Sequence, residues 1–325
     1  MKNILFLMLC FFVVFVSCKE PKVIEINSEE LLQNLKELSD DSYRGRLFSS
    51  PEGAKARKFI VEKFKDAGLQ PINGEYEHEF SATLKKKQRQ DLFPIKKNPL
   101  DDYSNVPDTT VVGGNAFGIL NGETNKTIVI TAHYDHLGVI NEKIYNGADD
   151  NASGISALFT IAKYFKNKPT KHNLVFAAVD AEEVGSLGAD YFLKNFNNRE
   201  NIVLNVNLDM IAHSDYDPEL FGSGLYHYPD LRDPLEDVHS EKIMFLFGHD
   251  DPNNREQADW TFSSDHKVFY RSNIPHMYFG VPDHKDYHRY TDTYATINEA
   301  FFIEAVKVII QSIENLDQHL YEEAN

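Results

Sequence analysis

The sequence predicts an α/β fold with a mixed, largely parallel central sheet and helices on both faces. Four short apolar runs rich in β-branched residues recur along the chain from residue 127 onward. Segments with apolar residues at helical spacing separate these runs, and the hydrophobic content of 42% is typical of a globular protein. Strands that alternate with helices in this way form a sheet covered by helices on both sides.

Residues 1–17 are predicted to be a lipoprotein signal peptide. Lys2 precedes an apolar stretch at residues 4–16 that is too short to span a bilayer comfortably, and Cys18 follows a small residue. This resembles the lipobox of bacterial lipoproteins, in which the cysteine becomes the lipidated first residue. Residues 18–27 are then a tether, and we expect a lipid-anchored protein of the cell envelope, on the periplasmic or the outer-membrane face. The alternatives are a plain signal peptide and an uncleaved anchor.

Residues 28–325 are expected to form a single domain. Ser28 is a candidate N-cap of a helix over residues 28–38, and Gly68 marks the end of a second helix that begins near Ser50. These helices form an N-terminal elaboration, after which residues 73–112 are expected to be an irregular excursion. Strands are predicted at residues 127–133, 173–180, 201–210 and 274–281, and helices at residues 152–165, 188–196 and 298–316. Residues 214–260 show no periodicity and are expected to form an irregular insertion.

Composition and motifs exclude several functions. The chain has 33 basic and 50 acidic residues, a formal net charge of −17, whereas nucleic-acid binding requires a basic face. The basic stretch at residues 85–98 is interpreted as a solvated loop. The chain has no GxSxG motif, and HEFSA at His78 does not complete HExxH, so a serine hydrolase and a classical HExxH metalloprotease are both excluded. The only cysteines are Cys10 and Cys18, so the mature chain has no pair for a disulfide.

Acidic and imidazole side chains gather where the predicted strands end. The carboxyl ends of parallel strands meet at one edge of the sheet, where open α/β folds bind their ligands. Taken singly, each of these residues has an ordinary explanation as a cap, a turn residue or a hydrogen-bonded histidine. Together they predict a site for divalent metal ions, which offset the repulsion among acids and accept neutral imidazole. The residues are His133, Asp135, His136, Asp149, Asp150, Asp180, Glu182, Glu183, Asp209, His284, His288 and Asp292.

Asp150 is the acid that we expect to bridge two ions. Zinc ions about 3.5–4 Å apart require a shared carboxylate, which explains why a second acid is retained beside Asp149 in a tight turn. A helix that begins just after the turn also favours negative charge there.

Five segments carry a resemblance to a known family. HYDH, GADDNASG, DAEEVGSLGA, NLDM and YHRYTDT, in this order and spacing, resemble the M28 family of di-zinc peptidases, the aminopeptidase Y-like co-catalytic metallo-exopeptidases. The resemblance covers residues 118–297, and flanking segments are similar to those of exported bacterial members. It implies two zinc ions that share Asp150 as a bridging ligand. The other implied ligands are His133 and Asp209 for one ion, and Glu183 and His288 for the other.

The same resemblance implies further roles. Glu182 takes the place of the general base, Tyr287 is a candidate oxyanion donor, and a cis peptide bond is expected after Asp150. Asp135 and Asp292 are expected to orient the imidazoles of His133 and His288. The final motif departs from the usual pattern, because YHRYTDT lacks the proline common in relatives. Asp149 and His284 therefore remain alternative ligands.

The resemblance implies a zinc-dependent exopeptidase, most directly an aminopeptidase that hydrolyses the N-terminal peptide bond of peptides with a free N-terminus. Two alternatives share the fold: a glutaminyl-peptide cyclotransferase, which uses one zinc ion, and a binding domain without catalysis. The sequence does not indicate the side-chain preference of the substrate pocket or the oligomeric state.

The predicted lipid anchor can be tested by Cys18→Ser. The variant should move from the membrane fraction into the soluble fraction, because burial of acyl chains contributes about 0.8 kcal/mol per CH₂ to membrane binding. Fractionation of cells that express either form, followed by immunoblotting, measures the shift. A variant that stays wholly in the membrane fraction would contradict the lipidation of this cysteine.

Overall fold

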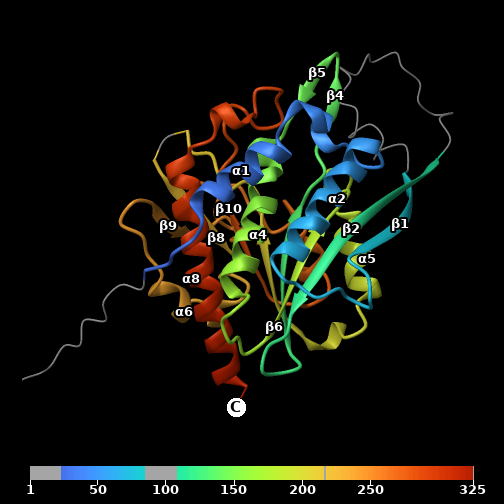
Figure 1. The fold of residues 1–325 in the computed structure, drawn as a ribbon. Coiled ribbons are helices and arrows are strands. Elements are labelled where there is room, and N and C mark those ends of the chain that lie inside the picture. The colour runs from blue at the N-terminus through green and yellow to red at the C-terminus, as the bar shows by residue number, and fades with distance from the viewer. Residues whose placement is uncertain (1–22, 85–107, 216, 325) are drawn as a thin grey trace, which may run out of the picture.

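The computed structural model describes residues 23–84, 108–215 and 217–324. The predicted signal peptide, the first half of the tether with Cys18 (residues 18–22) and the basic stretch at residues 85–98 lie outside these ranges. An eight-stranded sheet runs through the described part, with strand order β1-β2-β6-β3-β7-β10-β8-β9, and a separate two-stranded sheet pairs β4 with β5 (Figure 1). No helix among the described residues combines the length and apolar character needed to cross a membrane.

The centre of the sheet is parallel, as predicted. It consists of β6 (Asn173–Val179), β3 (Thr127–His133), β7 (Ile202–Leu208) and β10 (His276–Gly280). β3 pairs in parallel with both β6 and β7, and β10 pairs in parallel with β7. Every residue of β3 and β10 is buried, which explains why these strands appear in the sequence as continuous apolar runs. All four strands point their carboxyl ends to one edge.

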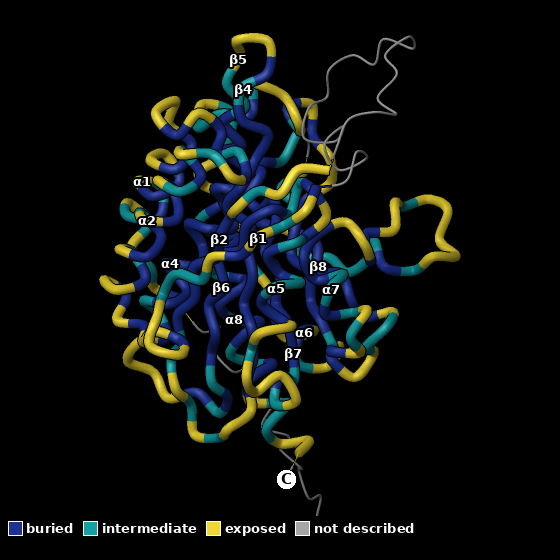
Figure 2. Tube along the Cα trace, turned by 90° about the vertical axis from the view of Figure 1, so that its right-hand side faces the viewer, coloured by how far each residue is buried: buried dark blue, intermediate teal, exposed yellow. Residues whose placement is uncertain are grey.

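Helices cover both faces of this sheet. Alternate residues of β3 divide between two cores: Ile128 and Ile130 pack into one, and Val129 packs into the other. The first core is closed by α1 (Ser28–Leu38), α2 (Pro51–Asp66), α4 (Gly154–Phe165) and α8 (Glu299–Glu323), and the second by α5 (Leu187–Asn195) and α7 (His266–Tyr270). Figure 2 shows the buried strands enclosed by partly exposed helices and exposed loops. The predicted fold class is therefore confirmed.

Two stretches expected to be irregular contribute strands at the sheet edges. β1 (Glu77–Leu84) and β2 (Thr109–Leu120) form an antiparallel pair at one edge, and β8 (Glu219–Ser223) and β9 (Met244–Phe247) close the other. The expectation of an irregular excursion at residues 73–112 and an irregular segment at 214–260 was wrong at these strands. Charged, polar and glycine residues interrupt the apolar pattern of β1, β2 and β8, and β9 has only four residues. In β1 only Phe80 and Leu84 are buried.

The remaining elements are short. α1 begins one residue earlier than expected at its cap, because Asn27 rather than Ser28 accepts the hydrogen bond from the backbone N–H of Glu30 at 3.1 Å. Gly68 follows α2 with a φ of +77°, as its predicted role as a helix terminator requires. The other short elements are β4 (Gly138–Ile140), β5 (Lys143–Tyr145), α6 (Asp233–Glu236) and the helical turns η1 (Asp41–Arg46), η3 (Ala148–Ser153), η4 (Arg199–Asn201), η5 (Pro229–Leu231) and η6 (Tyr294–Thr296).

Candidate metal centre

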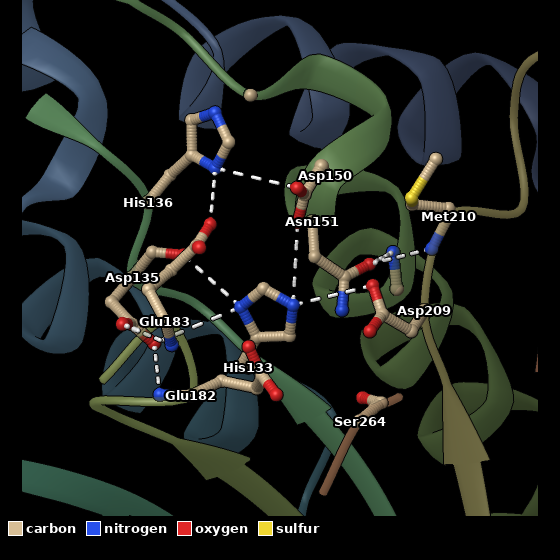
Figure 3. A network of polar contacts seen from close by, with 12 residues as sticks. His133, Asp135, His136, Asp150, Asn151, Glu182, Glu183, Asp209, Met210 and Ser264 are labelled. Atoms are coloured by element: carbon tan, nitrogen blue, oxygen red, sulfur yellow. Dashed lines mark hydrogen bonds and ion pairs between the residues drawn. The ribbon is translucent and has the colours of Figure 1, made fainter. Parts of the chain in front are cut away.

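The structure brings the five predicted metal ligands together at the carboxyl edge of the parallel strands, and Figure 3 shows four of them, His133, Asp150, Glu183 and Asp209. Asp180 lies apart, where its carboxylate accepts hydrogen bonds from Gly114 and Tyr134. His133 ends β3, Asp209 follows β7, and Glu182 and Glu183 lie between β6 and α5. Asp150 lies in the turn before α4, and His288 lies in the loop after β10. The sequence order therefore places each side chain at a strand end or in the loop that follows it.

One triad of potential ligands forms around His133. Its Nε2 lies 3.2 Å from Oδ1 of Asp209 and 3.4 Å from Oδ1 of Asp150. Its Nδ1 faces the backbone carbonyl of Asp135 at 3.1 Å, a contact that places the proton on Nδ1 and leaves Nε2 free to bind a metal. Burial opposes charge on the ring, but Asp209 and Asp150 raise the pKa of His133 well above its usual value.

A second group forms on the other side of Asp150. Nε2 of His288 lies 3.2 Å from Oδ2 of Asp150 and 3.5 Å from Oε2 of Glu183. Ligand atoms on one tetrahedral zinc ion lie about 3.4 Å apart, since each sits about 2.1 Å from the metal. These spacings, like those in the first triad, match that value.

His136 is a residue whose role sequence reasoning missed. Its Nδ1 lies 2.7 Å from Oε1 of Glu183 and 3.6 Å from Oδ2 of Asp150, and its Nε2 is buried without a hydrogen-bond partner in the described structure. The 2.7 Å contact has the length of a charge-assisted hydrogen bond, shorter than the spacing of two ligands on one ion. His136 therefore orients Glu183, and its only signal in the sequence is its position three residues after His133.

Asp150 is shared by the two groups, with Oδ1 toward His133 and Oδ2 toward His136 and His288. Burial acts to raise the pKa of Asp150, but the neighbouring imidazoles, His136 first, hold it below its usual value. The expected cis peptide bond between Asp150 and Asn151 is present. The arrangement can place two cations on opposite sides of one carboxylate.

The turn that carries Asp150 is fixed by contacts from distant segments. Both carboxylate oxygens of Asp292 accept backbone hydrogen bonds, from Asp149 at 3.0 Å and from Asp150 at 3.1 Å. Asp292 was expected to orient His288. Instead, its two carboxylate oxygens bind the backbone N–H groups of the turn, so Asp292 holds the turn in place. The side chain of Asn151 donates to the carbonyl of Leu208 at 2.9 Å and ties the turn to the end of β7.

The two alternative ligands face away from this centre. Oδ1 of Asp149 accepts the backbone N–H of Ala212 at 2.6 Å, and its Oδ2 lies 3.1 Å from Nε2 of His284. The ring of His284 stacks on that of His213, with centroids 3.8 Å apart. Asp149 and His284 thus pair with each other rather than with Asp150.

Glu182 belongs to neither group of ligands and faces the cavity beside them. Its Oε1 accepts hydrogen bonds from Nζ of Lys267 at 3.1 Å and from the hydroxyl of Ser186 at 3.3 Å. Burial raises the pKa of Glu182 to about 7, although Lys267 opposes the shift. The carboxylate of Asp135 accepts the backbone N–H groups of Glu182 at 3.0 Å and Glu183 at 3.4 Å. Asp135 contacts Nδ1 of His133 through its carbonyl at 3.1 Å and through its carboxylate at 3.7 Å, and the same carboxylate positions the two glutamates.

A buried arginine supports the same region from the N-terminal segment. Arg46 donates to the carbonyls of Tyr134 and Leu38, each at 2.7 Å, and to those of Asn146 at 2.6 Å and Gly147 at 2.9 Å. Burial lowers the pKa of Arg46 to about 10, so the guanidinium stays charged at neutral pH beside the acidic cluster. The predicted N-terminal elaboration is therefore tied to the catalytic edge of the sheet.

A cavity of about 250 Å³ opens beside the candidate centre. His133, Asp150, Glu183, Asp209 and His288 line it together with Glu182. Tyr287 also lines it, and its ring stacks on that of His288 with centroids 3.9 Å apart. A ligand in this cavity would contact the candidate metal ligands, Glu182 and Tyr287 at once.

Comparison with known proteins identifies the class of enzyme as a peptidase. The family model described as peptidase family M28 matches residues 115–313. The chain belongs to this family.

Individual relatives match about half of the chain. It is 24% identical over 184 residues to the alkaline phosphatase isozyme conversion protein of Escherichia coli strain K12, a match to 53% of this chain and 48% of the relative. It is 25% identical over 214 residues to leucine aminopeptidase 2 of Trichophyton rubrum, covering 59% and 42%. The match thus spans about half the length of these curated relatives.

Solved structures share the fold. A zinc aminopeptidase from Bacillus subtilis superposes with a TM-score of 0.68 at 15% identity, covering 90% of this chain and 96% of the other. A glutaminyl cyclase from Fimbriiglobus ruber gives the same TM-score at 16% identity, covering 91% and 97%. The likeness in fold is therefore equal for two different chemistries, and only the site can separate them.

The role of Arg46 can be tested by Arg46→Met, with Arg44→Met as the matched control. The first change removes the donors of four carbonyls in a buried region and should lower the free energy of unfolding by at least about 3 kcal/mol. Arg44 makes a single ion pair, at 3.7 Å to Glu52, and its side chain is 54% exposed, so its loss should change stability by less than about 0.5 kcal/mol. Urea unfolding of both variants measures the difference. Equal midpoints would show that Arg46 does not hold the turn.

Proposed function

We propose that this protein is a zinc-dependent aminopeptidase that removes residues from the free N-terminus of peptides. The observation that carries the proposal is the sharing of Asp150 between two groups of histidine and carboxylate ligands at ligand-like spacing. Membership of peptidase family M28 and similarity to a leucine aminopeptidase support a peptidase rather than another metal-dependent reaction. Export and anchoring through Cys18 would place this activity in the cell envelope.

The donor set fits two zinc ions. Imidazole nitrogen and carboxylate oxygen are common zinc ligands, and each group offers one histidine, one terminal carboxylate and one oxygen of Asp150. We assign His133 and Asp209 to one ion, and Glu183 and His288 to the other, with Asp150 between them. This leaves an open position on each side for substrate and water. Zinc ions bound here would supply Lewis-acid polarisation of the scissile carbonyl and a lowered pKa for the attacking water.

Glu182 and Tyr287 carry out proton transfer and stabilisation of the developing negative charge. Glu182 accepts a proton from the attacking water and passes it to the departing amine, and its pKa near 7 suits both steps at neutral pH. Lys267 and Ser186 hold one of its oxygens and so fix the direction of the other. Burial, followed by Asp150, raises the pKa of Tyr287, so its hydroxyl remains protonated and can donate to the oxygen that gains charge.

The two alternative functions, a glutaminyl cyclase and a binding domain, would give different products from an aminopeptidase. A glutaminyl cyclase would convert N-terminal glutamine to pyroglutamate without releasing the residue. A binding domain would leave every peptide unchanged. Incubating the zinc-loaded mature chain with glutaminyl and leucyl peptides, followed by mass spectrometry, separates the three. Free N-terminal residues support the proposal, while pyroglutamate formation or an unchanged peptide would overturn it.

Neighbouring glutamates with different assigned roles give a sharper test. Glu183→Gln removes a charge from the metal ligands and should lower zinc occupancy and activity together. Glu182→Gln keeps size and polarity but cannot accept the proton, so kcat should fall by about 10²–10⁴ while both zinc ions are retained. Metal analysis and steady-state kinetics on both variants provide the readouts. Loss of zinc from Glu182→Gln, or activity within a few-fold of wild type, would show that the roles are assigned wrongly.

A further inference from the structure

The cavity beside the candidate metal centre carries more negative charge than that centre requires. Its described lining contains no lysine or arginine but six acidic residues. Four of them are Asp150, Glu182, Glu183 and Asp209, the carboxylates of the proposed function. The other two, Asp259 and Asp283, take no part in either ligand group.

The charges of Asp259 and Asp283 are not required by the metal centre. Asp150, Glu183 and Asp209 are the carboxylate ligands of the proposed function, and Glu182 is paired with Lys267. Asp259 and Asp283 therefore remain as two negative charges of the lining that take no part in that ligation or pairing. Both residues are exposed at its rim, and neither forms an ion pair with another residue in the described ranges.

Both acids lie on anchored backbone. One carboxylate oxygen of Asp259 accepts the N–H of Thr261 at 2.9 Å and its hydroxyl at 2.6 Å, which fixes the side chain and leaves the second oxygen free. Asp283 directly precedes His284, whose ring is held by Asp149 and by the stack on His213. The side chain of Asp259 is therefore fixed before any substrate arrives, and the backbone next to Asp283 is held through His284.

The wall between the rim and the metal ligands is apolar. Met210, Trp260, Val281 and Tyr287 line it, and the first three of these are at most 8% exposed. The indole of Trp260 is fixed by stacking on His249, with ring centroids 3.6 Å apart. Such a wall suits a long aliphatic stem, and the rim acids suit a cationic tip at its end.

We propose that this cavity is a subsite for a cationic side chain, so that the preferred substrates are peptides with lysine or arginine at the N-terminus. The inference rests on the proposed aminopeptidase function and names the substrate class for the same site. Asp259 and Asp283 attract the side-chain cation, while the apolar wall packs against its methylene groups.

Matched pairs of substrates isolate the charge. Lysyl and norleucyl aminomethylcoumarin amides differ in the terminal ammonium, and arginyl and citrullyl amides differ in the guanidinium. We expect kcat/KM for the charged member of each pair to be about tenfold higher, and the ratio to fall as salt is raised, because rim charges are screened. A ratio near one in low salt would overturn the proposal.

Variants of Asp259 and Asp283 test whether these two acids cause the preference for a cationic side chain. The double variant Asp259→Asn/Asp283→Asn should bring the lysine-to-norleucine ratio close to one. Glu62→Gln/Asp66→Asn, an equal change of net charge at exposed positions of α2, should leave the ratio as in wild type. If the double variant lowers kcat/KM for both substrates by the same factor, the acids bind the α-ammonium group, and the proposal is wrong.

A binding measurement separates failure of this inference from failure of the proposed function. If the zinc-loaded protein cleaves none of the amides, the aminopeptidase proposal fails. Calorimetric titration with lysinamide and norleucinamide then judges the subsite by itself. Tighter binding of lysinamide, lost in the double variant, supports a cation subsite; equal binding overturns it.

Discussion

The structure depends on keeping several carboxylates close together around Asp150 at one edge of the sheet. Their mutual repulsion must be offset, and their positions must be fixed before any metal or substrate binds. The chain achieves this by anchoring the Asp150 turn to three distant segments: Asp292 from the loop after β10, Leu208 from the end of β7, and Arg46 from the N-terminal segment. The turn is therefore held by hydrogen bonds to its backbone, which leaves the carboxylate of Asp150 free.

Contacts with neighbouring side chains distinguish the roles of the acids. Imidazoles surround Asp150 and hold its pKa below the usual value, whereas burial raises the pKa of Glu182 to about 7 and that of Glu183 to about 8. Glu183 contacts His136 and His288, while Glu182 contacts Lys267 and Ser186. Nearby Asp265 is fully buried with no hydrogen-bond partner in the described structure, and burial and the charge of Glu182 raise its pKa to about 8. Lys267 pairs with Glu182 in this setting. Similar side chains therefore serve as ligand and as proton acceptor because their surroundings differ.

The sequence was most informative where one local rule decides the structure. The parallel strands β3 and β10 were predictable because burial on both faces leaves a continuous apolar run. The candidate ligands were predictable because they follow such runs in recognisable segments. The strands β1, β2 and β8 were missed because charged, polar or glycine residues interrupt their apolar runs, and β9 was missed because it has only four residues. Arg46 and Lys267 were missed, and His136 was given no specific role, for another reason: their partners lie up to 101 residues away, and no local pattern marks such contacts.

The central claim is that one carboxylate serves two metal ions. Zinc titration of Asp150→Ala and Asp209→Ala, followed by calorimetry and metal analysis, tests it directly. Two ions should bind wild type, and Asp209→Ala should weaken only one of them, because Asp209 contacts a single group. Asp150→Ala should weaken both. If Asp150→Ala kept one ion at wild-type affinity, Asp150 would not be shared, and the dinuclear account would be contradicted.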